Sequence, residues 1–187
     1  MQKNFNMKTR VILASLFVSM ALFSCKKEVK EEAAEAVVVD DTKDLFKVSL
    51  DLLLKKNDTL HLYYTEDGSI NFTEESSVWL PVSGKETNQE VTFMLPKDVY
   101  PTELRMDFGV NGQQDDVLLN KVKLDYMDKS FVISDSLIYN YFRIDENVTV
   151  MDPKTKGLRR KDPKQRNGAS LYPHEVALKA EIDKLAK

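Results

Sequence analysis

The residue types that catalysis requires are present in this chain, but their spacing matches no catalytic motif. His61 and His174 lie far apart, and neither has a partner at the spacing of zinc ligands. The sequence contains neither a nucleophile-elbow motif nor a glycine-rich phosphate loop. Asp115 and Asp116 are adjacent, so on a strand their carboxylates point to opposite faces and cannot flank one bond. We therefore predict no catalytic residues, no enzyme activity and no metal site built on the histidines.

A polar loop offers one candidate cation site. Residues 107–116 (DFGVNGQQDD) gather carboxylate and amide oxygens around two glycines, and oxygen is the ligand atom that calcium prefers. The segment lacks the ligand spacing of an EF-hand, and a polar hairpin loop would have the same composition. Calcium near Asp107, Asn111 and Asp115 is therefore the one cofactor that the sequence suggests, with a metal-free loop as the alternative.

Aromatic and planar polar side chains fall opposite the apolar face of several expected strands. Within 103–108, apolar residues alternate with Arg105 and Asp107, so this pair projects from the other face. The same alternation sets Trp79 and Tyr63 against their apolar neighbours. Flat rings stack on pyranose rings, and planar polar groups pair with vicinal hydroxyls. All four are therefore candidate ligand-binding residues. The alternative is a Trp79 that fills the core and an Arg105–Asp107 ion pair that joins strands.

A basic segment interrupts an otherwise acidic chain. Residues 152–168 contain two prolines, two glycines and seven basic residues, a composition typical of an exposed loop. Such a loop is a candidate docking site for an anionic glycan or an acidic protein, and the alternative is a solvated loop that carries the positive charges of the domain. The candidate docking residues are Arg159, Arg160, Lys161, Lys164 and Arg166.

The elements that would position these residues are short strands. Apolar residues alternate with polar ones from Phe46 onward, and segments of this kind are separated by turn residues with no helical pattern between them. The predicted strands lie at 46–52, 60–64, 77–82, 90–95, 103–108, 116–126, 131–134, 141–144 and 148–151. This order favours an all-β fold, an antiparallel β-sandwich. After Ser170 and Pro173, Leu178, Ile182 and Leu185 recur at helical spacing and predict a short C-terminal helix.

The N-terminus has the features of a secretory signal. Three basic residues precede the apolar stretch 11–24, which is too short to span a bilayer and ends in a small residue, Ser24. The sequence 22–25 (LFSC) resembles the lipobox of bacterial lipoproteins, which implies cleavage before Cys25 and a lipid on that cysteine. The alternatives are a plain signal peptide with an incidental cysteine, and a buried apolar helix. The predicted organisation is a signal peptide at 1–24, a lipid anchor and flexible tether at 25–44, the β-sandwich at 45–151, and the basic loop with the helix at 152–187.

Charge and cysteine content narrow the function further. The formal net charge is −3, and cleavage before Cys25 would remove three basic residues and no acidic one. A general nucleic-acid-binding protein is expected to be basic, so we predict no nucleic-acid partner. Cys25 is the single cysteine, which excludes a disulfide framework. The lipid on Cys25 is then the predicted contact with the membrane.

Residues 62–124 as a unit resemble the jelly-roll sandwiches of carbohydrate-binding modules. The resemblance lies in a strand that closes in Leu-Pro at 95–96, followed by the segment LRMDFG at 104–109 and a polar loop. It implies a jelly-roll-like sandwich and glycan recognition.

The segment 30–32 (KEE) resembles the acidic export signal of surface lipoproteins of Bacteroidota, and the alternative is an ordinary solvated linker. We therefore expect an outer-membrane lipoprotein and leave open whether it faces the periplasm or the exterior. The sequence thus predicts a lipid-anchored binding module of the cell envelope with a glycan as candidate ligand. The alternative is a structural or assembly subunit of an outer-membrane complex that contacts an envelope protein.

Overall fold

The computed structural model describes residues 42–187 and contains two antiparallel sheets that pack face to face. The first sheet has the order β4-β1-β6-β7, with β1 at Lys47–Leu53, β4 at Gln89–Met94, β6 at Leu118–Tyr126 and β7 at Lys129–Ser134. The second has the order β3-β2-β5-β11-β8, with β2 at Asp58–Thr65, β3 at Ser77–Val82, β5 at Glu103–Phe108, β8 at Phe142–Ile144 and β11 at Ala169–Pro173. The predicted all-β sandwich is confirmed.

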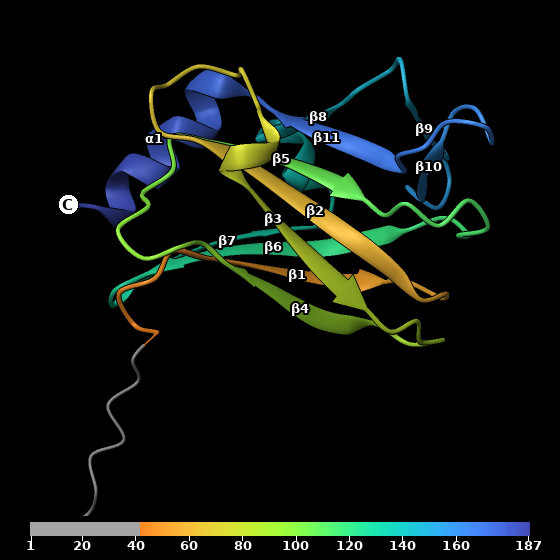
Figure 1. Ribbon diagram of the computed structural model, residues 1–187, viewed down its shortest axis with the longest axis horizontal. Helices are drawn as coiled ribbons and strands as arrows, with labels where there is room; N and C mark the ends of the chain where they lie inside the picture. The colour runs from red at the N-terminus through yellow and green to blue at the C-terminus, as the bar shows by residue number, and fades with distance from the viewer. Residues whose placement is uncertain (1–41) are drawn as a thin grey trace, which may run out of the picture. The chain divides into compact units, whose positions relative to one another are not determined.

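Smaller elements complete the domain. A two-stranded pair joins β9 at Thr149–Met151 to β10 at Leu158–Arg160, and the 3-10 helices are η1 at Glu74–Ser76 and η2 at Asp135–Asn140. The α-helix α1 spans Glu175–Leu185. Figure 1 shows the two sheets as layers, with α1 at one end of them and the β9–β10 pair at the other.

Alternation along the strands builds the core between the sheets. In β1, Val48, Leu50 and Leu52 are almost completely buried and belong to the same apolar cluster as Leu60 and Leu62 of β2. Each side chain of this size contributes about 1.5–3 kcal/mol when it is removed from water. The chain changes sheet after β1, β3, β4, β5 and β7, an alternation that a jelly-roll also has. Each strand segment predicted up to Met151 overlaps an observed strand.

The sequence analysis predicts that the sandwich ends at Met151, but two strands lie beyond this residue. Strand β11 lies between β5 and β8, and β10 pairs with β9 inside the segment that was expected to be a loop throughout. The β11 residues 169–172 alternate between the two faces of the sheet, as expected for a strand. Ala169 and Leu171 are buried in the core, while Ser170 and Tyr172 project from the other face. Ser170 and Pro173 were read instead as the start of a helix. The helix begins two residues after Pro173, at Glu175.

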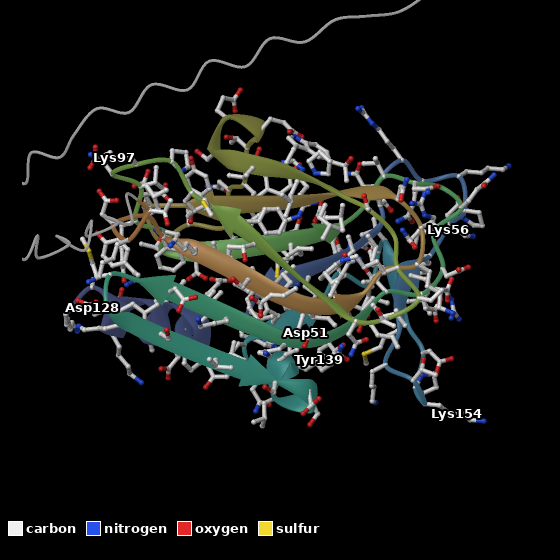
Figure 2. The ribbon with its side chains drawn as sticks, turned by 90° about the horizontal axis from the view of Figure 1, so that it is seen from below. Asp51, Lys56, Lys97, Asp128, Tyr139 and Lys154 are labelled. Carbon is white, nitrogen blue, oxygen red and sulfur yellow. The ribbon has the colours of Figure 1, made fainter. Side chains whose placement is uncertain are left out.

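Helix α1 closes one end of the sandwich. Leu178, Ile182 and Leu185 are its buried residues, as their spacing predicted, and the Tyr100 hydroxyl donates a hydrogen bond to the Ile182 carbonyl. In Figure 2 the four-stranded sheet is in front, with Lys97 and Asp128 near the α1 end and Lys56 and Lys154 near the opposite end. The edge strand β3 contains Pro81, which pairs with Thr59 of β2.

The predicted signal peptide and the lipidation site lie outside the described residues, as does nearly all of the tether. Both the lipid on Cys25 and the envelope location therefore remain predictions from the sequence. Over residues 42–187, no helix has the length and apolar character needed to cross a membrane.

A buried carboxyl group lies beneath α1. Glu103, the first residue of β5, is 1% exposed, and its Oε2 has no hydrogen-bond partner among the described residues. Burial is the main cause that raises the pKa of Glu103 to about 7 from its ordinary value of 4.5, and the charge of Glu175 adds to this effect. Lys179 acts in the opposite direction. The folded protein therefore favours the neutral carboxyl group.

This predicts a loss of stability as the pH rises. Because the pKa of Glu103 is higher in the folded state, its contribution is fully present below 4.5 and is lost as the pH passes about 7. The free energy of unfolding should fall by roughly 2–3 kcal/mol between about pH 5 and about pH 8, and Glu103→Gln should abolish most of this fall. Urea unfolding at the two pH values measures it, with exposed Glu90→Gln as control. An unchanged pH dependence in Glu103→Gln would contradict the prediction.

Candidate ligand-binding groove

All four predicted ligand-binding residues lie on the outer face of the five-stranded sheet. The strand register sets Trp79 of β3 opposite His61 of β2, and His61 opposite Asp107 of β5. One step along, Tyr63 lies opposite Arg105. Three neighbouring strands thus bring together residues that are far apart in the sequence. His61, for which the sequence analysis found no role, is at the centre of this set and is buried.

Trp79 presents one face of its indole to solvent. The side chain is 44% exposed, which excludes the alternative in which Trp79 fills the core. Its other face stacks on the His61 imidazole, with ring centroids 3.6 Å apart and an interplanar angle of 18°. The His61 ring in turn lies 3.8 Å from that of Tyr63. The indole is therefore held flat on the sheet, which keeps its open face available for stacking.

A partly buried Arg105 and a buried Asp107 form an ion pair. The guanidinium donates from Nε to Oδ1 at 2.9 Å and from Nη2 to Oδ2 at 2.7 Å. The same guanidinium lies 4.7 Å from the ring centroids of both Tyr63 and Tyr172, so one cation is held between two aromatic rings. Asp107 and Tyr63 are almost fully buried. Arg105 and Asp107 therefore match the alternative in which they form an ion pair that joins strands. Of the four predicted ligand-binding residues, Trp79 is the most accessible to a ligand.

The segment between β2 and β3 covers part of this face. The Tyr63 hydroxyl donates to Glu74 Oε1 at 2.9 Å, and His61 Nε2 lies 3.7 Å from Glu74 Oε2. The Phe72 ring packs near Tyr63 and, edge-on, near Tyr172. Burial lowers the pKa of His61 and, with the hydrogen bond to Glu74, raises that of Tyr63. Both groups are therefore neutral at pH 7, and the Glu74 carboxylate supplies the negative charge beside them.

A groove of about 700 Å³ opens beside Trp79. Its lining combines residues of the Trp79 side with residues that precede β9 and β11: Glu74, Trp79, Val148, Gln165, Arg166 and Asn167. Trp79 and Arg166, which the sequence placed in two separate candidate sets, therefore line one groove. Sequence reasoning missed Glu74, Val148, Gln165 and Asn167, because no motif marks them and only the folded loops bring them together.

The other candidate docking residues mostly have partners within the protein. Arg159 forms an ion pair with Asp116 at 3.1 Å, and the Arg160 guanidinium donates to the carbonyls of Gln165 and Asn111. Lys161 donates to the Glu146 carbonyl at 2.8 Å. Of the five, only Lys164 and Arg166 have side chains without a hydrogen-bond or ion-pair partner in the described part of the chain.

The predicted calcium ligands are engaged in other contacts. Asp107 binds Arg105, the Asn111 side chain bonds Asn57 and Gln113, and Asp115 lies near Lys56. Between residues 42 and 187, no three His, Cys, Asp or Glu side chains gather in a way that could hold a metal ion. The calcium site therefore stays a prediction without support from these contacts.

Asp58 organises the polar loop instead. Its Oδ1 accepts hydrogen bonds from the backbone N–H groups of Thr59, Val110 and Asn111. Gly109 has a φ of +89°, and a Cβ there would lie 2.1 Å from Asp58 Oδ2. Glycine is therefore required at this position.

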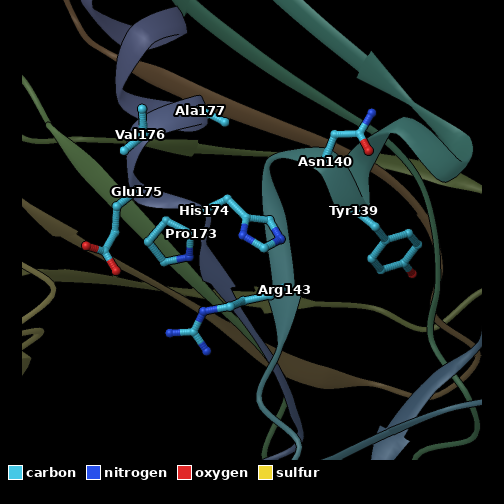
Figure 3. A pocket seen from close by; sticks show the side chains of 8 residues that line it. All are labelled: Tyr139, Asn140, Arg143, Pro173, His174, Glu175, Val176 and Ala177. Atoms are coloured by element: carbon cyan, nitrogen blue, oxygen red, sulfur yellow. The ribbon is translucent and has the colours of Figure 1, made fainter.

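A second hollow, of about 640 Å³, lies at the start of α1 (Figure 3). It is lined by Tyr139, Asn140, Arg143, Pro173, His174, Glu175, Val176 and Ala177. The Arg143 guanidinium lies 5.3 Å from the Tyr172 ring centroid, so this hollow adjoins the aromatic cluster of the outer face. His174 and His61 lie in different surroundings, since His174 lines this hollow and His61 lies beneath Trp79.

Comparisons with known proteins found no match for this chain among protein-family models, curated proteins or solved structures.

The stacked pair predicts a specific fluorescence response. Trp79 is the only tryptophan, so its emission reports on this face alone. His61→Ala removes the ring on which the indole rests and should cost about 1–2 kcal/mol of stability, with a red shift and greater acrylamide quenching. His61→Phe keeps a flat ring and should retain the emission of the wild type. Equal quenching in His61→Ala and the wild type would show that the stack does not hold Trp79.

Proposed function

We propose that this chain is a lipid-anchored binding module of the cell envelope that recognises a glycan in the groove beside Trp79. The observation that carries the proposal is the exposed indole face, held flat by His61 at the wall of a groove of about 700 Å³. Sites for small ligands commonly occupy about 300–1,000 Å³. A groove of this size accommodates a short saccharide.

The lining supplies the two kinds of contact that a sugar needs. The indole offers a flat apolar surface for the C–H face of a pyranose ring. Asn167 has an amide without a hydrogen-bond partner among the described residues, and Arg166 adds planar donors for ring hydroxyls. The anchor and the envelope location rest on the sequence around Cys25, and the absence of catalytic motifs favours binding over reaction.

A second candidate function is assembly with an envelope protein. Strand β7 pairs with β6 alone, so it is an edge of its sheet. Met127, Val132 and Leu137, before, within and after this strand, are each at least half exposed. An exposed edge with apolar side chains can accept a strand from a partner. This observation favours a protein contact on the far side of the domain from Trp79.

A glycan array with matched variants tests the first proposal. The wild type should bind at least one glycan, and Trp79→Ala should weaken that binding by about tenfold or more. The variant lacks the ring surface on which the sugar stacks, and burial of a large apolar side chain contributes about 1.5–3 kcal/mol. Val132→Ala removes an exposed apolar side chain elsewhere and should bind like the wild type.

The alternative gives a different pattern. No glycan binding by the wild type, together with one stoichiometric partner recovered from membranes and lost in Val132→Ala, would reject the glycan proposal and support the assembly function.

A further inference from the structure

Arg166 lines the groove and has no partner among the described residues, unlike three other cations of the same segment. The charges of Arg159, Arg160 and Lys161 are directed to Asp116 and to backbone carbonyls. A guanidinium carries five N–H donors, and those of Arg166 have no acceptor within residues 42–187. These donors are therefore available to a ligand.

The loop that carries Arg166 is fixed by its neighbour Gln165. The Gln165 amide nitrogen donates to the carbonyls of Val148, Asn167 and Gly168 at 2.8, 3.0 and 3.2 Å. Its Oε1 accepts the backbone N–H of Asp162 at 3.1 Å, and its own carbonyl accepts from Arg160. This bracing orders the backbone on both sides of Arg166 before a ligand arrives, which lowers the entropy cost of binding.

The acidic residue of the groove already has partners. The Glu74 carboxylate accepts the Tyr63 hydroxyl and lies 3.7 Å from His61, while its side chain is 66% exposed. The groove thus combines a stacking surface, an engaged carboxylate and an available guanidinium. A neutral sugar would use the indole but would leave the charge of Arg166 without a partner.

We propose that the groove selects acidic saccharides, with a sugar ring on Trp79 and its anionic group bound by Arg166. This inference rests on the proposed glycan-binding function and adds the ligand class. A guanidinium binds a carboxylate or a phosphate through two parallel hydrogen bonds, and such charge-assisted bonds are about twice as strong as neutral ones. The protein as a whole carries a net charge of −3, so Arg166 must offset the repulsion that an anionic sugar meets elsewhere.

The test compares charged and neutral ligands that share a carbohydrate skeleton. Trigalacturonic acid and its methyl ester share one carbohydrate skeleton, and titration calorimetry at low ionic strength measures both. The wild type should prefer the acid by about tenfold, which corresponds to about 1.4 kcal/mol, and added salt should reduce this preference. The same titrations with mannose 6-phosphate and with neutral mannose show whether a phosphate can replace the carboxylate.

Two variants locate the effect. Arg166→Gln should bind acid and ester about equally, because the guanidinium that pairs with the anionic group is gone. Lys164→Gln removes the same charge from the same loop outside the groove lining and should keep the preference. Thermal unfolding of both variants confirms that they fold.

Each other outcome rejects the inference in a distinguishable way. A preference that survives in Arg166→Gln, or is lost equally in both variants, would overturn the role of Arg166. Trp79-dependent binding of neutral sugars with no preference for either acid would overturn the ligand class and leave the glycan-binding function standing. No binding of any saccharide by the wild type would overturn both.

Discussion

The guanidinium of Arg105 is the contact on which the outer face of the five-stranded sheet depends. A buried cation is tolerated only when its charge and its donors are matched. Asp107 supplies the charge through two hydrogen bonds, while the guanidinium lies over the rings of Tyr63 and Tyr172. Tyr63 then fixes Glu74. The wall of the groove is therefore connected to an ion pair that a ligand need not touch.

The loops at the β9–β10 end are tied together in a comparable way. Asp58 gathers the backbone around Gly109, and Gly168 donates its N–H to the Gly109 carbonyl. Arg160 joins the same region to Gln165. The segment that carries Arg166 thus starts from a backbone that three separate parts of the chain hold in place. Rigid support of this kind is what allows loops to present binding residues with a defined geometry.

Much of the fold can be predicted from the alternation of apolar and polar residues along each strand. The groove cannot be predicted in this way, because loops that are far apart in the sequence form it. Alternation in β2, β3 and β5 was strong enough to predict the strands and to place Trp79 and Arg105 opposite the apolar face. It could not predict the burial of Tyr63, because a loop without a sequence signal covers that residue. Strand β11 was missed because its five residues include Ser170 and Pro173, which also favour a helix start. The meeting of Trp79 with Arg166 depends on the Gln165 hydrogen bonds, which no pairwise spacing in the sequence encodes.

Pro81 in the edge strand β3 affects self-association. An edge strand offers a row of free N–H groups on which a second chain can add its own strand, and proline removes one donor from that row. Pro81 lies two residues from Trp79, so the edge next to the groove is a poor template for strand addition. Neighbouring copies of the protein are therefore less able to pair along β3, although Trp79 is exposed beside that edge.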